Sequence, residues 1–167
     1  MSKYYRKYLL LLPIFILIQV LVLNEILFFT YINPYLYLAL IISYPLKAPK
    51  TTLLFYGFIL GFCIDLFGGS PGFHSTASVF IAFIKPAIAK ITIPHNLLGE
   101  TDEITANKIG KKSFITFSFL IIIIHNNILF SLEHLNFNLQ ILSKIFFSSL
   151  VTLAIILIFE IFKSNSK

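Results

Sequence analysis

The chain of 167 residues contains few charged residues and a single cysteine. Only 12% of its residues are charged, whereas 57% are apolar and the mean hydropathy is +0.89. A soluble domain of this length needs more polar surface to cover its core, so the composition predicts a membrane protein with several spans. The cysteine, Cys63, lies in an apolar run. One cysteine excludes an internal disulfide, and the sequence offers no metal site built from thiolates.

The sequence also lacks the short motifs of several enzyme classes. It contains no Gly-x-Ser-x-Gly elbow, no His-Glu-x-x-His pair and no glycine-rich phosphate loop. Asp65 is an isolated carboxyl group inside an apolar segment, so it has no partner for acid–base catalysis. The histidines are scattered and are not spaced as metal ligands. We therefore expect a protein that is not an enzyme and that uses neither a cofactor nor a metal.

Six apolar segments are candidates for membrane spans. They cover residues 8–29, 35–46, 51–67, 73–90, 113–132 and 139–162. The segment 35–46 is the shortest, because about 12 residues of helix rise only about 18 Å against a hydrocarbon layer of about 30 Å. It is either a re-entrant segment or a tilted helix in a thinned bilayer.

The distribution of basic residues favours a crossing by the segment 35–46. With six spans, every lysine and arginine except Lys144 falls in the inner half of the molecule, on the side of the N-terminus. The positive-inside rule makes this side cytoplasmic, so the net charge of +6 does not require a nucleic-acid partner. We expect one all-helical transmembrane domain over residues 1–167, with both termini cytoplasmic.

The cytoplasmic loop 91–112 is expected to contain a short helix. Thr101 is a suitable N-cap, and Glu103 suits the first turn because a carboxyl group stabilises a helix N-terminus. Lys108 suits the last turn and Gly110 the exit from the helix.

The stretch 57–85 reads GFILGFCIDLFGGSPGFHSTASVFIAFIK and predicts two apolar helices joined by a glycine- and proline-rich corner. Gly57, Gly61 and Asp65 recur at intervals of four and share one face of the first helix. Small residues at this spacing let another helix approach closely. Asp65 either caps the corner, contacts the transmembrane helix of a partner, or takes part in proton or ion coupling.

Polar residues also occur in the second arm and in the fifth apolar segment. In the second arm, His74 is expected at an interface and Ser78 adds to a small, polar packing surface. Lys85 is too far from Asp65 for a direct ion pair and is expected to extend toward the cytoplasmic headgroups. The fifth segment and its end carry His125, Asn126 and Glu133. We expect these three to form hydrogen bonds between helices, and not an acid–base dyad.

The corner has the pattern Gly-x-x-x-Asp followed by Pro-Gly-x-His, formed here by Gly61, Asp65, Pro71, Gly72 and His74. This pattern resembles the rod shape-determining MreD family of bacteria. The Lys85–Pro86 pair and the segment 123–133 are similar to the Bacteroidetes branch of that family. A second histidine is usual in that branch where this chain has Asn126.

The resemblance implies a non-catalytic inner-membrane subunit of the bacterial cell-elongation machinery. Such a subunit would dock the bitopic scaffold protein MreC. Through MreC it would connect MreB filaments to a peptidoglycan glycosyltransferase and transpeptidase pair at the lateral wall. The implied fold is a six-span helical bundle similar to the substrate-binding subunits of energy-coupling-factor transporters. Residues with a structural or partner-binding role would be Gly57, Gly61, Asp65, Pro71, Gly72, His74 and Ser78.

The fold analogy also leaves open a second function. The chain would then be the subunit of such a transporter that binds a small molecule, namely a vitamin or a metal. That function requires a polar pocket toward the outer side of the membrane. The candidates for its lining are Asn24, Glu25, Asp65, His74 and Glu133.

Overall fold

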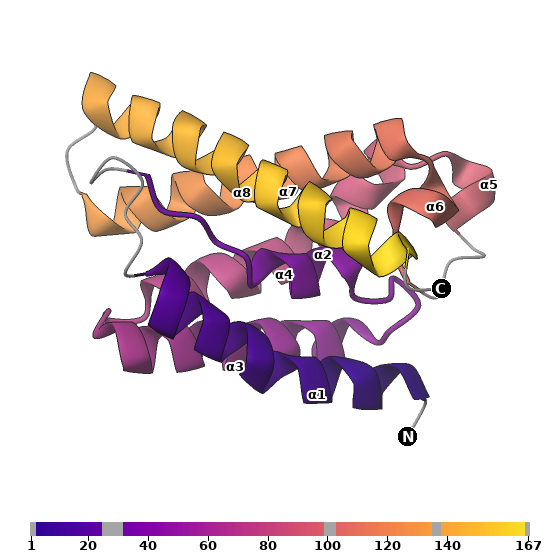
Figure 1. Cartoon of the computed structure of the whole chain (residues 1–167), viewed down its shortest axis with the longest axis horizontal. Helices are drawn as coiled ribbons and strands as arrows, with labels where there is room; N and C mark the ends of the chain where they lie inside the picture. The colour runs from indigo at the N-terminus through magenta and orange to yellow at the C-terminus, as the bar shows by residue number, and fades with distance from the viewer. Residues whose placement is uncertain (1–2, 25–31, 99–102, 135–137, 166–167) are drawn as a thin grey trace.

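A computed structural model of the chain describes residues 3–24, 32–98, 103–134 and 138–165. Within these ranges the regular elements are all helices (Figure 1). They are α1 (Lys3–Ile18), the π-helix η1 (Gln19–Leu23), α2 (Leu38–Ser43), α3 (Lys50–Gly68), α4 (Phe73–Thr92), α5 (His95–Leu98), α6 (Ala106–Ile109), α7 (Lys111–Glu133) and α8 (Leu139–Asn165). Five helices in the described ranges are long and apolar enough to cross a membrane: α1 with η1, α3, α4, α7 and α8. They indicate a multi-pass membrane protein.

Five of the six predicted spans coincide with these long helices. The bounds of α3, α4, α7 and α8 lie within a few residues of the predicted segments. The first span begins as α1 and continues through η1 to Leu23. Its predicted end, at residues 25–29, lies outside the described residues.

The segment 35–46 is not one continuous helix, so of its two expected forms the tilted transmembrane helix is not observed. Only Leu38–Ser43 is helical there, and the residues before α2 form irregular backbone and a turn. Tyr44 ends α2 with φ −58° and ψ 139°, because the residue before Pro45 is excluded from the helical region by the proline ring. The same restriction applies to Asn33, which precedes Pro34.

This irregular segment lies in the interior of the protein. The residues from Tyr37 to Ile42 are almost completely buried, and α2 contacts α1, α4 and α7. In Figure 1, the segment and α2 run between α7 and α8 on one side and α1 and α3 on the other. Non-helical backbone is tolerated at membrane depth only where protein surrounds it and its N–H and C=O groups find partners.

Side chains of the long helices provide partners for the first part of the segment. Three hydrogen bonds join the Asn33 N–H to Ser148 Oγ (3.2 Å), the Tyr35 N–H to Thr152 Oγ1 (3.1 Å), and Gln19 Nε2 to the Pro34 carbonyl (2.9 Å). Ser148, Thr152 and Gln19 are fully buried. These polar residues of α8 and η1 therefore satisfy backbone groups that a helix would have satisfied by itself.

Side chains of the long helices also bind backbone carbonyl groups at the end of α2. The Tyr8 hydroxyl donates to the Ser43 carbonyl (2.5 Å), and the Lys85 ammonium donates to the Tyr44 carbonyl. Lys85 is 0% exposed, so the prediction that it extends to the cytoplasmic headgroups is wrong. A cation at a helix C-terminus is favourable because the last carbonyls carry partial negative charge.

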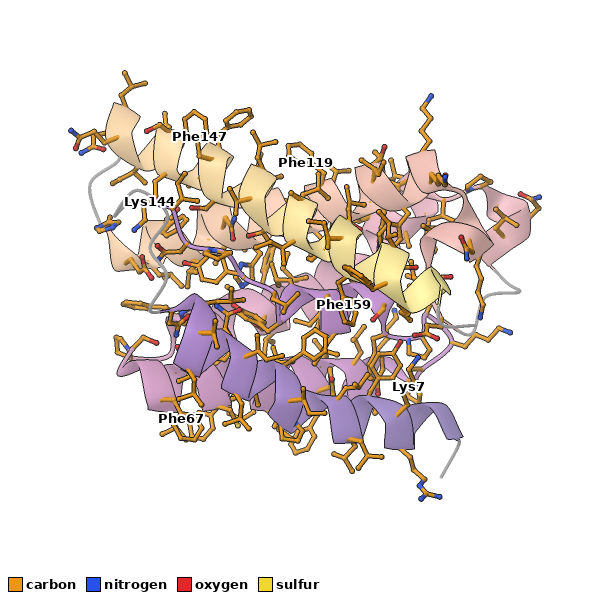
Figure 2. All side chains as sticks on the ribbon, viewed as in Figure 1. Lys7, Phe67, Phe119, Lys144, Phe147 and Phe159 are labelled. Atoms are coloured by element: carbon orange, nitrogen blue, oxygen red, sulfur yellow. The ribbon has the colours of Figure 1, made fainter. Side chains whose placement is uncertain are left out.

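The irregular segment returns the chain to the end of the molecule where α1 begins. Ser43 lies beside Tyr8, in the first turns of α1. Lys7 of α1 and Lys163 of α8 both bind the carboxyl group of Glu103. The start of α1 and the end of α8 therefore lie at the same end of the molecule, as Figure 1 also shows. Elsewhere, Phe159 of α8 packs against Phe15 of α1 with ring centroids 5.2 Å apart (Figure 2).

The helices α3 and α4 pack so closely that their backbones are in contact. A Cβ atom added to Gly61 would lie 2.5 Å from Ser75 Cα, and one added to Gly57 would lie 3.0 Å from the Ser78 carbonyl oxygen. The predicted close approach at this glycine face is confirmed. The approaching helix is α4 of the same chain, so the face is not open to a helix of a partner.

We expect Gly61→Ala to destabilise the protein. The new methyl group would meet backbone atoms of α4 that cannot rotate away, so α3 and α4 would have to separate. Overpacking of this kind costs about 1–3 kcal/mol of unfolding free energy. Thermal unfolding in detergent measures the effect.

The matched control is Gly68→Ala near the end of the same helix. The nearest atom to a Cβ there is Asn24 Nδ2 at 3.9 Å, an ordinary contact distance. Close packing of α4 against Gly61 is refuted if the two variants unfold at the same temperature as the original protein.

Candidate functional site

Asp65 organises the corner between α3 and α4. Its Oδ1 atom accepts hydrogen bonds from the Ser70 hydroxyl (2.5 Å) and the His74 N–H (2.9 Å). Its Oδ2 atom accepts from the Ser75 N–H (2.8 Å) and the Ser75 hydroxyl (2.6 Å). The first N–H groups of a helix lack partners within the helix, and here a side chain of the preceding helix provides them. Among the interpretations of Asp65, the cap of the corner is therefore confirmed.

The two glycines that bracket the corner permit this geometry. Gly69 ends α3 with φ +67°, and Gly72 precedes α4 with φ +94°. Residues with a Cβ atom rarely adopt this left-handed region, so glycine is required at both positions. Pro71 lies between them, where its ring fixes the backbone. The corner thus brings α4 back against α3 with the start of α4 facing Asp65.

His74 also takes part in a second cluster, through its side chain. Its Nδ1 atom is 3.0 Å from the Tyr37 hydroxyl, and Nε2 of His125 is 2.8 Å from the same hydroxyl. Tyr37 and His125 are 0% exposed, and His74 is 9% exposed. The structure thus joins two histidines of α4 and α7 through a tyrosine that precedes α2. No local pattern in the sequence predicted this pairing.

The cluster continues to α8. His125 Nδ1 lies 3.1 Å from Asn126 Oδ1, and Asn126 Nδ2 donates to Ser149 Oγ at 2.9 Å. The hydrogen bonds predicted for His125 and Asn126 between helices are therefore present. Glu133, the third residue of that prediction, is the last residue of α7, about 12 Å along the axis from His125.

This cluster is suited to holding helices together. Each of its members hydrogen-bonds another part of the same chain, and the aromatic ring of Tyr35 packs against both imidazoles at 5.7 Å. In the described part of the chain, no group of three or more His, Cys, Asp and Glu side chains could hold a metal ion. The buried Ser78, predicted as a site residue, lies in the contact of α4 with Gly57.

The polar residues proposed for a small-molecule pocket are largely engaged within the protein. Asp65 binds the start of α4, and His74 binds Tyr37. Asn24 accepts a hydrogen bond from Gln19 at 2.9 Å. Glu25 lies outside the described residues.

A third cluster closes the end of the molecule where α1 begins. Glu103 Oε1 accepts from Lys163 Nζ (2.7 Å), Lys7 Nζ (2.9 Å) and the Tyr8 hydroxyl (3.0 Å). Burial raises the pKa of the Glu103 carboxyl group, but the hydrogen bonds and charges of the two lysines outweigh it and lower this pKa to about 2. Glu103 therefore ties the first and last helices to the loop between α5 and α6.

The short helix of this loop differs from its prediction. The helix α6 starts after Thr105. Glu103 precedes the helix and is not in its first turn; its buried side chain forms ion pairs with two lysines. The N–H of Ala106 is bound by Glu160 of α8 at 3.0 Å. The predicted cap, Thr101, lies outside the described residues. Sequence spacing alone could not reveal a partner that lies more than 50 residues away.

No known protein family, curated protein or solved structure matches this chain.

We expect Asp65→Asn to destabilise the protein by about 1–3 kcal/mol. An amide has one acceptor oxygen, so its NH₂ group would face two of the four donors, one of them a backbone N–H that would be left without a partner. Ser70→Ala is the control, because it removes only one of the four bonds and should cost less. Both are measured by unfolding in detergent, and an Asp65→Asn variant as stable as the original would contradict the capping role.

We expect Glu103 to make stability depend on pH in the acid range. The pKa of its carboxyl group is about 2 in the folded protein, against an ordinary value of 4.5. A lowered folded pKa gives stability that is present above about 4.5 and is lost as the pH falls toward 2. This contribution is on the order of 2 kcal/mol at neutral pH. The measurement compares unfolding of the original protein and Glu103→Gln between these pH values, and a constant difference would refute the assignment.

Proposed function

We propose that this protein is a non-catalytic scaffold subunit of the bacterial cell-elongation machinery, similar to MreD proteins. It would lie in the inner membrane, dock a bitopic partner like MreC and support peptidoglycan synthesis at the lateral wall. Through that partner it would be linked to MreB filaments and to a glycosyltransferase and transpeptidase pair.

The observation that carries the proposal is the role of the family-like residues at the corner. Gly61, Asp65 and the His74 N–H make contacts that hold α4 against α3, and Gly72 lets the chain turn into α4. The pattern thus specifies a rigid helical hairpin and does not assemble a reactive centre. A rigid hairpin is the part of a scaffold that a partner can recognise, because binding then requires no ordering of the receptor.

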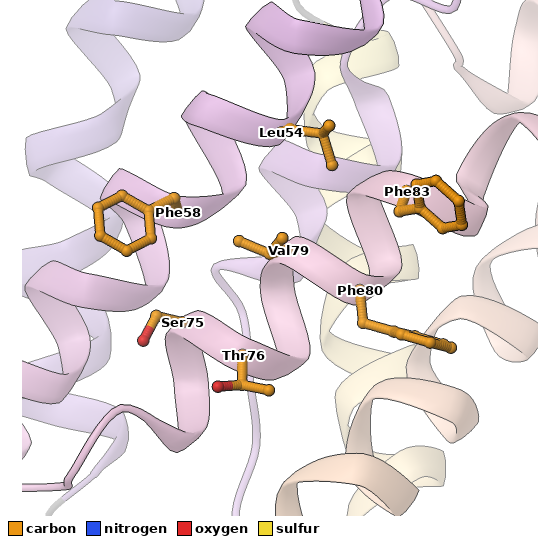
Figure 3. Close-up of a pocket in the computed structure, with 7 residues that line it drawn as sticks. All are labelled: Leu54, Phe58, Ser75, Thr76, Val79, Phe80 and Phe83. Carbon is orange, nitrogen blue, oxygen red and sulfur yellow. The ribbon is translucent and has the colours of Figure 1, made fainter.

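The surface for the partner is the outer groove between α3 and α4, and not the glycine face. This groove has a volume of about 580 Å³ (Figure 3). Ser75, Thr76 and Val79 give it small side chains, and Phe58 and Phe80 lie beside them, each 45% exposed. Small residues between larger ones let a second transmembrane helix approach closely.

The proposed orientation places the Glu103 end in the cytoplasm. Lys7, Lys163 and the loop lysines of residues 103–112 lie at this end, as the positive-inside rule requires. Five long helices and the irregular segment then give six passages through the membrane, with both termini cytoplasmic. The number of passages agrees with the six spans that the resemblance implies, although one of them is not a continuous helix.

Photo-crosslinking in the native bacterium tests the proposal. A photoreactive residue at Phe58 or Phe80 is expected to capture mainly one bitopic cell-shape protein, because both positions border the groove. Mass spectrometry identifies the adduct and the helix that carries it.

The control position is Phe147 of α8, which is 49% exposed and points away from the molecule on the side opposite to Phe67 of α3 (Figure 2). It should give no such adduct. Capture of the coupling subunit or ATPases of a transporter at the groove positions would reject the scaffold function in favour of substrate capture.

A further inference from the structure

A second groove lies between α1 and α3, at the end of the molecule closed by Glu103. It has a volume of about 460 Å³. Its floor is formed by the buried rings of Tyr8, Tyr44 and Tyr56, whose centroids lie 4.9 to 6.3 Å apart. Leu9 of α1 and Phe55 of α3 form its walls, and both are more than half exposed. The groove is therefore open to the surroundings along its length.

Except for Thr52, the lining of this groove is apolar or aromatic, and no charged side chain is among its residues. Tyrosines are enriched where the hydrocarbon layer meets the headgroups, because the ring is apolar and the hydroxyl is polar. The Tyr8 hydroxyl is bonded to Ser43 and Glu103, at the polar end of the groove. The tyrosine floor is therefore expected to lie at the membrane depth where the acyl chain of a lipid joins its headgroup.

Basic residues flank the mouth of the groove from both sides. Arg6 lies one turn before Leu9 on α1, and Lys50 is the first residue of α3, directly after Pro49, which lines the groove. Lys47 lies three residues earlier in the loop from α2. All three are exposed. Positive charge therefore gathers where an apolar groove reaches the membrane surface.

We propose that this groove binds one anionic phospholipid, with an acyl chain between Leu9 and Phe55 and its phosphate near Arg6 and Lys50. An acyl chain gains little on leaving other lipids for a protein groove, because both surroundings are equally apolar. Selectivity must then come from the headgroup charge, and each nearby lysine or arginine favours an anionic lipid by about fivefold. The site is independent of the proposed function.

A single tryptophan can report on this site, because the chain contains none. In vesicles with the full-length Phe55→Trp variant, brominated phosphatidylglycerol should quench the fluorescence with at least about tenfold higher relative affinity than brominated phosphatidylcholine. In the same variant, Arg6→Gln with Lys50→Gln should bring this ratio close to one. Lys111→Gln with Lys112→Gln is the matched control and should leave it unchanged.

A tryptophan on the side of the protein away from the groove distinguishes binding at a site from a general enrichment of anionic lipid around the protein. Phe162→Trp on α8 lies at the same end of the molecule and is 72% exposed. It should show no preference between the two lipids. Equal preference at both reporters, or a preference at Phe55→Trp that survives the Arg6 and Lys50 substitutions, would overturn the proposal. Native mass spectrometry of the unsubstituted protein gives the second readout, and loss of all lipid without selectivity would also overturn it.

Discussion

The need to pair a non-helical backbone inside a membrane-embedded protein determines where the polar side chains lie. In residues 33–44 only Leu38–Ser43 is helical, so the N–H and C=O groups of the other residues require other partners. Gln19, Thr152 and Lys85 are expensive to bury alone, and each is bonded to this segment. The long helices must therefore provide more than an apolar surface. Each of these polar side chains must also lie at the depth of the backbone group that it binds.

The hairpin of α3 and α4 obeys the same constraint in a smaller space. The corner leaves the first N–H groups of α4 without partners, and the Asp65 side chain accepts from two of them. This bond requires the helices to be close, which Gly61 makes possible by its contact with Ser75. Glycine and carboxyl group thus depend on each other, which explains why both belong to one sequence pattern.

The sequence predicted the long helices because apolar runs, prolines and glycines are local signals. It also included the Asp65 cap among three interpretations of this residue, since the donors lie within ten residues of the acceptor. It failed for α2, whose 12-residue apolar run resembled a short span. It also missed the bonds of Tyr37, Lys85 and Glu103, whose partners lie 37 to 96 residues away. A buried lysine and one that extends to the headgroups have the same local sequence, and only the position of Tyr44 distinguishes them.

The two outer grooves share α3 but differ in how α3 contacts the second helix of each groove. The α3–α4 groove is bounded by helices in backbone contact at Gly61, so its width is fixed. The α1–α3 groove is joined by side chains, with the Tyr56 hydroxyl donating to the Tyr8 carbonyl at 3.2 Å. Its walls are side chains of two helices, and Leu9 and Phe55 among them are more than half exposed. The first groove is therefore suited to recognising one rigid helix, and the second to accommodating a flexible chain such as that of a lipid.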